Sequence, residues 1–373
     1  MKVTVIGGGG IGGVMTADFS LLEGVEVILL SGRSEKFKDV IRVVDMERCI
    51  EFDSNPITVT SDHKIAIRDA DMILCTVPAD AREECIEKIS PFLKSGSYLG
   101  FVPGCGGSEF MCRELIDKGV IIFGIQRTPY NSLPIDYGKT YRCKARKREL
   151  YFSAVVTNHN PMIGDVLESL FNVPCIAMNN FMEIAFVPAN AILHTSRVLT
   201  LFKDYKEGVF YDRIPFLYLE WENESSERLL ACDEDLQEIC REYNAIDLSG
   251  IRFIKEHYES NSAEELTAKL QSIPPFKTTV PPMLKTENGY IPNLNARYFT
   301  EDFPFGVVNL KGFASIAKVP TPALDELLYW FQSLSGKEYF TETGELGKDI
   351  NNSSVPQKYG FATVNNIIKF YLR

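Results

Sequence analysis

The sequence of 373 residues predicts an α/β protein of two domains, the first built on a parallel sheet and the second all-helical. One reason is that the chain opens with a strand-like run that ends in the spacing Gly7-x-Gly9-x-x-Gly12 and continues into an amphipathic stretch. A second is that short apolar runs typical of buried parallel strands alternate with helical stretches as far as residue 179. From residue 180 onward the apolar residues follow long helical periods. We therefore predict domains over residues 1–179 and 180–373.

The opening turn is typical of the strand, tight turn and helix that hold the pyrophosphate of a dinucleotide. Val3–Ile6 has strand character, and Glu26–Leu30 supplies a second strand at the spacing of a βαβ unit. A phosphate needs backbone N–H groups at close range, and a Cβ at Gly7 or Gly9 would hold it away from the turn. The pattern thus favours a Rossmann-like dinucleotide-binding domain over a purely structural glycine turn. The residues expected to contact the cofactor here are Gly7, Gly9, Gly10, Ile11 and Gly12.

The tip of the second strand, Ser31-Gly32-Arg33-Ser34, has no carboxylate. An NAD-preferring domain places an acidic residue at this point to bind the ribose diol. The guanidinium of Arg33, helped by the hydroxyls of Ser31 and Ser34, suits a 2′-phosphate because it pairs with phosphate oxygens in a forked geometry. The sequence therefore favours NADP. NAD is the alternative, with Arg33 as an exposed loop residue in a site indifferent to the 2′ position.

The next predicted elements lead to the nicotinamide side of the domain. In order they are short strands within 39–68, a strand over 70–78, a helix over 81–93 and a strand over 97–102. Ligands of open α/β sheets bind at the carboxyl ends of the strands. Val77, Pro78 and the loop after Val102 are therefore expected to face the nicotinamide, although their Pro and Gly content also suits turns alone.

The first domain is predicted to end with a strand over Val120–Ile125, a helix over Pro161–Phe171 and a strand over Val173–Ala177. Six basic residues crowd into positions 139–148, between strand-like runs at 140–143 and 149–152. Because alternating charge on a strand marks its wet face, this arrangement predicts a charged surface hairpin.

The second domain is predicted to be helical around one long loop. The expected helices are Phe181–Lys203, Tyr218–Tyr243, Ala263–Gln271 and Pro322–Leu334. Between the last two, residues 273–305 contain six prolines and few apolar periods. An ordered loop of this length is usually functional.

Composition excludes several classes of partner. A net charge of −11 argues against nucleic acid or an anionic membrane as the main partner, since both favour a basic face. The nine cysteines form no CxxC and no metal-ligand spacing, which predicts free thiols in a reducing compartment and no metal site. No apolar run reaches transmembrane length, so we expect a cytoplasmic protein. The oligomeric state stays open, with a homodimer as one option.

Only one of the four histidines falls in a helical stretch with a polar residue on the same face. His194 follows Asn190 by four residues, whereas the other three lie in polar surroundings. A helical histidine of this kind is often a satisfied structural residue. The long loop contains Arg297 and Asp302 ahead of a Phe-Pro-Phe-Gly turn, which alone would also suit a capping or salt-bridge segment.

The chain resembles the octopine/nopaline (opine) dehydrogenase family in the order and spacing of its motifs over nearly the whole length. The motifs are the glycine turn, the strand ending in Val77-Pro78, Gln126-x-x-Pro129, Asn190-x-x-x-His194, Arg297-x-x-x-x-Asp302-x-Pro304 and Thr321-Pro322-Ala323-Leu324-Asp325. The family couples an amino acid to a 2-oxo acid and reduces the imine with NAD(P)H. It uses a Rossmann domain and an all-helical second domain.

The resemblance also implies roles for individual residues. His194 would be the general acid/base, and Asp302 would hydrogen-bond its other ring nitrogen to fix the tautomer. Arg297 would clamp the carboxylate of the oxo acid with help from Gln126, and Asn190 would contribute to substrate binding.

The predicted function is therefore an NAD(P)H-dependent opine dehydrogenase whose partners are an amino acid and a 2-oxo acid. One alternative is a reductase of a simple 2-oxo acid, similar to the ketopantoate reductases, whose catalytic group is a lysine. Another is a non-catalytic protein that binds a dinucleotide.

Overall fold

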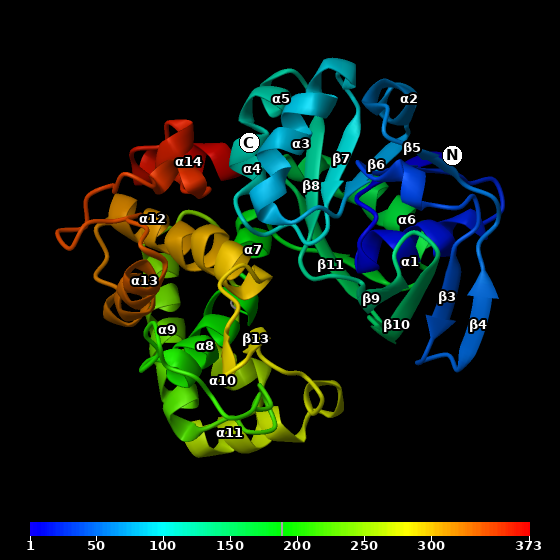
Figure 1. Ribbon diagram of the computed structural model, residues 1–373. Coiled ribbons are helices and arrows are strands. Elements are labelled where there is room, and N and C mark those ends of the chain that lie inside the picture. Colours follow the sequence, from blue (N-terminus) through cyan, green and yellow to red (C-terminus); the bar gives the residue numbers. More distant parts are fainter. Residues whose placement is uncertain (188) are drawn as a thin grey trace. The chain divides into compact units, whose positions relative to one another are not determined.

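The computed structural model describes the backbone of residues 1–187 and 189–373 and the side chains of all of these except Ala189 and Asn190 (Figure 1). It divides into two compact units. Unit 1 comprises Met1–Ala185 together with Phe370–Arg373, and unit 2 comprises Phe186–Lys369. The predicted mixed α/β architecture, with a parallel sheet followed by a helical domain, is confirmed. The domain boundary at residue 179 stays a prediction.

Unit 1 is built on an eight-stranded sheet of order β12-β11-β8-β7-β6-β1-β2-β5. From β8 to β5 all neighbours pair in parallel, whereas β11 runs antiparallel to β8. The strands are β1 Lys2–Ile6, β2 Glu26–Leu30, β5 Thr58–Thr60, β6 Met72–Cys75, β7 Tyr98–Phe101, β8 Ile121–Ile125, β11 Leu150–Ala154 and β12 Cys175–Ala177. The helices are α1 Gly10–Ser20, α2 His63–Ile67, α3 Arg82–Ile89, α4 Ser108–Met111, α5 Arg113–Asp117, α6 Asn160–Phe171 and α7 Met182–Ala185.

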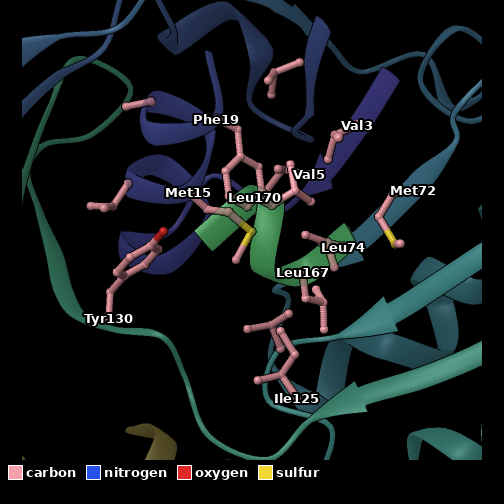
Figure 2. Packing of buried hydrophobic residues seen from close by; sticks show 14 of the residues in the cluster. Val3, Val5, Met15, Phe19, Met72, Leu74, Ile125, Tyr130, Leu167 and Leu170 are labelled. Carbon is pink, nitrogen blue, oxygen red and sulfur yellow. The ribbon is translucent and has the colours of Figure 1, made fainter. Parts of the chain in front are cut away.

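The core of unit 1 lies between the central strands and two helices. Met15 and Phe19 of α1 pack with Leu167 and Leu170 of α6 over the side chains of β1 (Figure 2). Val3 and Val5 are fully buried, which explains why the strand is apolar. This packing fixes the start of α1 directly beyond the carboxyl end of β1.

A second, four-stranded sheet of order β4-β3-β10-β9 corrects the predicted basic hairpin. Its strands are β3 Arg42–Asp45, β4 Ile50–Asp53, β9 Tyr130–Asp136 and β10 Thr140–Arg146. The prediction that 140–143 pairs with 149–152 was wrong, because β10 pairs with β9 and β3, while β11 belongs to the main sheet. The pairing of β10 with this second sheet is explained by a buried side chain on its inner face. Tyr141 is buried and donates a hydrogen bond of 2.8 Å to the carbonyl oxygen of Gly8, so this strand is anchored on the glycine turn.

Unit 2 is mainly helical. Its α-helices are α8 Thr195–Phe202, α9 Asn223–Glu242, α10 Ile254–His257, α11 Ala263–Ser272, α12 Val308–Ala317, α13 Pro322–Ser335 and α14 Val364–Tyr371, the last of which ends in unit 1. The described residues include two π-helices, η5 Ala189–His194 and η7 Tyr298–Val307, together with a hairpin of β13 Met283–Thr286 and β14 Gly289–Pro292. Short 3-10 helices are η1 Ser34–Lys36, η2 Ala79–Ala81, η3 Ser90–Phe92, η4 Thr157–His159, η6 Pro274–Phe276, η8 Ile350–Asn352 and η9 Pro356–Tyr359.

Two predictions for this part of the chain were wrong in detail. The expected single helix 181–203 is divided into α7, the π-helix η5 and α8. The expected loop 273–305 contains the β13–β14 hairpin and the first turns of η7, and Pro304 lies inside that helix rather than in a turn. A proline inside a regular α-helix removes a backbone hydrogen bond and clashes with the preceding turn, which is why the sequence pattern predicted a break here.

Among the described residues, none of the helices has the length and apolar character needed to cross a membrane. The nine cysteines are free thiols. No group of three or more His, Cys, Asp or Glu side chains in the described part of the chain could hold a metal ion.

Candidate functional site

The glycine turn presents the start of α1 without a side-chain cap. Gly7 has a φ of +102°, and α1 begins at Gly10 with Gly9 as its N-cap. The N–H of Gly13 is the first to join the helix ladder, at 2.8 Å from the carbonyl oxygen of Gly9. The amides of Gly10, Ile11 and Gly12 are therefore the helix's orphan donors, at its positive end. This is the arrangement that binds phosphate oxygens.

The glycines of the turn serve different purposes. A Cβ built on Gly9 meets nothing within 4 Å, so this residue leaves the approach to the helix start open. A Cβ on Gly12 would lie 1.9 Å from the carbonyl oxygen of Gly7, so Gly12 is needed for the close packing of helix and strand. A Cβ on Gly7 would meet the hydroxyl of Thr76 at 2.8 Å, inside the protein. Gly7 is thus required by the turn, and Gly9 keeps a ligand's path clear.

The tip of β2 lies beside this turn within unit 1. Arg33 is exposed, and its guanidinium carbon lies 5.9 Å from the centre of the Tyr137 ring. Ser31 is buried and accepts a 3.2 Å hydrogen bond from the N–H of Arg33. Tyr137 in turn packs edge-on against Phe37, whose ring would touch a Cβ at Gly8. The two residues predicted to read the 2′ position are therefore in one short segment next to the glycine turn.

Val77, Pro78 and Gln126 follow the carboxyl ends of β6 and β8, as predicted. The side chain of Val77 would contact a Cβ at Gly7 at 3.2 Å, so it borders the turn. The amide nitrogen of Gln126 donates to the carbonyl oxygen of Glu183 at 3.3 Å and lies 3.1 Å from the sulfur of Met178. Gln126 is thus held against the segment 178–183.

In unit 2 the structure brings His194 and Asp302 into contact. The ring nitrogen Nδ1 of His194 lies 2.8 Å from Oδ2 of Asp302, although the two residues are 108 positions apart. Their side chains are 19% and 12% exposed, so the pair is mostly shielded from water. With Nδ1 bound to the carboxylate, Nε2 is the nitrogen that can take up or release a proton.

Both residues of this pair lie on π-helices, an irregularity that is frequent at functional sites. His194 ends η5, and Asp302 lies within η7. The two helices approach closely at Gly306, where a Cβ would lie 2.9 Å from the Cβ of Ala191. The absence of a side chain at Gly306 therefore helps to set the distance between His194 and Asp302.

The surroundings of the pair tune its electrostatics. Burial raises the pKa of Asp302, and the neighbouring His194 opposes that rise. The ring of Tyr298 lies edge-on to the imidazole, 4.8 Å between centres. Burial, assisted by the charge of Asp302, raises the pKa of Tyr298 to about 12, so this phenol stays protonated near neutral pH. Sequence reasoning missed Tyr298, although it directly follows Arg297 in the motif.

Arg297 is exposed and already paired. Its Nε donates to Oε2 of Glu301 at 2.5 Å, and its Nη2 contacts the same oxygen. The predicted carboxylate clamp is therefore engaged by a side chain one turn away on η7. The side chain of Asn190, the other predicted substrate contact in this unit, lies outside the described residues.

A protein-family model matches residues 177–335. The matching model describes the α-helical domain of NAD/NADP octopine/nopaline dehydrogenases. The matched range includes His194, Arg297 and Asp302.

Relatives match over nearly the whole chain. An opine dehydrogenase from Haliotis discus hannai is 27% identical, with 98% of each chain covered. A solved octopine dehydrogenase with NADH and L-arginine superposes with a TM-score of 0.88 at 26% identity, covering 99% of this chain and 98% of that one. Another complex of octopine dehydrogenase contains NADH and pyruvate. A 2-dehydropantoate 2-reductase from Geobacter metallireducens shares the fold, with a TM-score of 0.65 at 11% identity over 90% of this chain and 100% of that one.

Proposed function

Because the chain belongs to the octopine/nopaline dehydrogenase family, we propose that it is an NAD(P)H-dependent opine dehydrogenase. It would condense the amino group of an amino acid with a 2-oxo acid and reduce the resulting imine. The observation that most supports this function is the 2.8 Å contact between His194 and Asp302 inside the segment that matches the family's helical domain.

The glycine turn fits a nicotinamide dinucleotide. The open approach at Gly9 and the free amides of Gly10, Ile11 and Gly12 would hold its pyrophosphate. Val77 and Pro78 would lie toward the nicotinamide, because they follow the carboxyl end of β6. When bound, the nicotinamide supplies the hydride that reduces the imine.

We propose NADP as the preferred cofactor. The exposed guanidinium of Arg33 and the hydroxyl of Ser31 lie next to the glycine turn, and no carboxylate occupies residues 31–34 to bind a ribose diol. An arginine in this position would pair with the 2′-phosphate. Related octopine dehydrogenase structures contain NADH, so the preference needs a direct measurement.

His194 would move the protons of the reaction. Condensation of the amine and the 2-oxo acid releases water, and Nε2 of the protonated imidazole can give its proton to the departing oxygen. In the reverse direction the neutral ring takes the proton back. Asp302 holds Nδ1, keeps the proton-transferring nitrogen oriented and stabilises the charged ring. The protonation state of His194 thus links the two directions of the reaction.

Arg297 would bind a substrate carboxylate by exchanging partners. It now pairs with Glu301 four residues along the same helix, and its side chain is 65% exposed. Ion pairs of this kind contribute only about 0.3–0.5 kcal/mol, so a carboxylate substrate can replace Glu301 at low cost. Gln126 and Asn190 are proposed as further substrate contacts.

The deciding experiment follows oxidation of NADPH and NADH with pyruvate, 2-oxoglutarate and oxaloacetate, each with and without a panel of amino acids. The proposal expects oxidation that requires both an oxo acid and an amine. Oxidation without any amine would favour a 2-oxo acid reductase, whose only support here is a shared fold. Dinucleotide binding without turnover would favour the non-catalytic alternative. A cytoplasmic location and a homodimer remain proposals, the latter open to sedimentation analysis.

A further inference from the structure

The last residues of the chain are part of the dinucleotide-binding unit. Phe370–Arg373 belong to unit 1, and the rings of Phe370 and Tyr371 lie 5.5 and 6.0 Å from the ring of Phe110 in α4. Arg373 adds an ion pair of 3.1 Å with Asp117 at the end of α5. The C-terminus therefore packs on the elements that directly follow the loop after β7.

Tyr371 reaches a buried carboxyl group that the proposed chemistry does not use. Its hydroxyl donates a 2.6 Å hydrogen bond to Oε1 of Glu109, across 262 positions of sequence. Glu109 is 0% exposed, and its second oxygen, Oε2, is buried with no hydrogen-bond partner among the described residues. A buried, unpartnered oxygen of this kind is costly as an anion and much cheaper as a protonated hydroxyl.

The groups that face Glu109 come from three directions. Tyr371 contacts it from α14, the charge of Arg82 acts on it from α3, and Cys112, which directly follows α4, interacts with it electrostatically. Burial raises the pKa of Glu109 to about 7, while the hydrogen bond from Tyr371 and the charge of Arg82 oppose the rise. Glu109 therefore changes its charge near neutral pH.

Arg82 connects this carboxyl group to the two loops proposed to face the nicotinamide. It is 1% exposed and donates to three backbone carbonyl oxygens, those of Val77 at 3.3 Å, Pro103 at 2.8 Å and Cys105. The first belongs to the turn after β6 and the other two to the loop after β7. The buried guanidinium of Arg82 thus hydrogen-bonds both loops and fixes their positions relative to each other.

We propose that Glu109 is a positioning residue of the cofactor site. It links the C-terminal residues, which contact it through Tyr371, to the loops held by Arg82. This inference rests on the proposed function, because it assumes that these loops border the nicotinamide. With a neutral Glu109, the guanidinium is fully available to the loop carbonyls. An ionised Glu109 attracts Arg82 and competes with them.

Because the pKa of Glu109 is raised, its effect on stability and binding should weaken as the pH increases. A carboxyl group whose pKa is raised on folding contributes stability at low pH, and the contribution is lost as the pH rises through the folded-state pKa, here about 7. Between pH 6 and pH 8 the neutral fraction falls about tenfold. If the neutral form is the binding-competent one, the dissociation constant of the dinucleotide rises by about the same factor.

The test measures the dissociation constants of NADPH and NADH by fluorescence, without other substrates, at pH 6 and pH 8. The affinity of the wild-type protein for the dinucleotide should fall about tenfold from pH 6 to pH 8. Glu109→Gln stays neutral at this position and should bind with a nearly constant affinity. Glu114→Gln, the same change at an exposed glutamate of α5, is the matched control and should behave as wild type. An identical pH dependence in Glu109→Gln and wild type overturns the proposal.

A second measurement does not need a bound cofactor. At neutral pH, amide hydrogen exchange of residues 104–107 should be slower in Tyr371→Phe than in wild type. The variant keeps the ring packing but loses a hydrogen bond that favours the ionised form of Glu109, so the neutral form increases and Arg82 stays on the loop carbonyls. Unchanged exchange would also overturn the proposal. A protein that binds no dinucleotide at any pH but shows the slower exchange in Tyr371→Phe would instead count against the proposed function.

Discussion

The glycine turn of unit 1 and the histidine–aspartate pair of unit 2 are built in opposite ways. The turn is a contiguous segment, in which Gly7, Gly9 and Gly12 serve a strand, a turn and a helix that follow one another. The pair joins His194 to Asp302 across 108 positions and depends on two irregular helices. The proposed function depends on missing side chains in the first region and on side chains brought together by packing in the second.

This difference predicts how each region responds to mutation. At the turn, backbone N–H groups are proposed to bind the cofactor, so an added Cβ would matter only where a ligand or another chain segment approaches. At the pair, a displacement of less than an ångström in either π-helix changes the geometry of proton transfer. The same substitution, glycine to alanine, should therefore affect cofactor binding in unit 1 and turnover in unit 2.

The largest effect is expected for His194→Ala. Removing the imidazole should lower kcat by about 10²–10⁴-fold, the usual range for a lost acid/base, while the dissociation constant of NADPH stays the same. Steady-state kinetics together with fluorescence titration would separate the two quantities.

The control for this variant is His257→Ala, which removes an exposed histidine of α10. It should keep wild-type turnover. If His194→Ala turned over at the wild-type rate, the assignment of His194 as the proton-transferring group would have to be withdrawn.

A smaller but still large effect is expected for Gly306→Ala. The new Cβ would lie 2.9 Å from the Cβ of Ala191, so η5 and η7 must move apart and the contact between His194 and Asp302 must lengthen. A misplacement of this size can lower kcat by about 10²-fold.

The double variant Ala191→Gly/Gly306→Ala provides the matched control. It moves the single methyl group from one helix to the other and should recover most of the lost turnover, because the two changes compensate at one contact. Equal kcat values for the single and the double variant would show that the spacing of the π-helices does not govern the pair.

The two regions also mark how far the sequence predicts the structure. The turn and the parallel strands follow from local patterns, since each glycine and each buried strand is explained by its immediate neighbours. His194 and Asp302 were predicted through the family resemblance, and the structure places them in contact. Their helical state was not predictable in detail, because the apolar period continues through 181–203 while the backbone changes from α-helix to π-helix.

Pairing between distant segments was beyond local patterns. The basic run 139–148 has strand character, but its partners β9 and β3 are chosen by the anchoring of Tyr141 on the glycine turn. The contact of Tyr371 with Glu109 joins segments 262 positions apart and has no periodic counterpart in sequence. Tertiary packing decides such contacts.

Gly9→Ala tests the turn in the same way as Gly306→Ala tests the pair. A Cβ at Gly9 meets no protein atom within 4 Å, so the melting temperature should stay the same, while the affinity for the dinucleotide falls about 10–100-fold as charged hydrogen bonds to phosphate lengthen. Calorimetry and fluorescence titration measure the two effects separately.

Gly12→Ala is the contrasting variant. Its Cβ would lie 1.9 Å from the carbonyl oxygen of Gly7, so we expect a clear loss of thermal stability. A Gly9→Ala protein that binds NADPH as tightly as wild type would show that the phosphate does not approach through Gly9.

The smallest expected effect is that of Arg33→Ala, which addresses only the 2′ position of the cofactor. Arg33 is exposed, and an exposed ion pair contributes about 1 kcal/mol at most. The KM for NADPH should therefore rise about fivefold, with the KM for NADH and the value of kcat unchanged.

The exposed Lys64→Ala variant, in α2, is a control for the loss of one positive charge. Because the guanidinium is screened by salt, the difference between NADPH and NADH should shrink as ionic strength increases. Equal effects of Arg33→Ala on both cofactors would mean that this arginine does not read the 2′-phosphate, and the proposed preference for NADP would lose its structural basis.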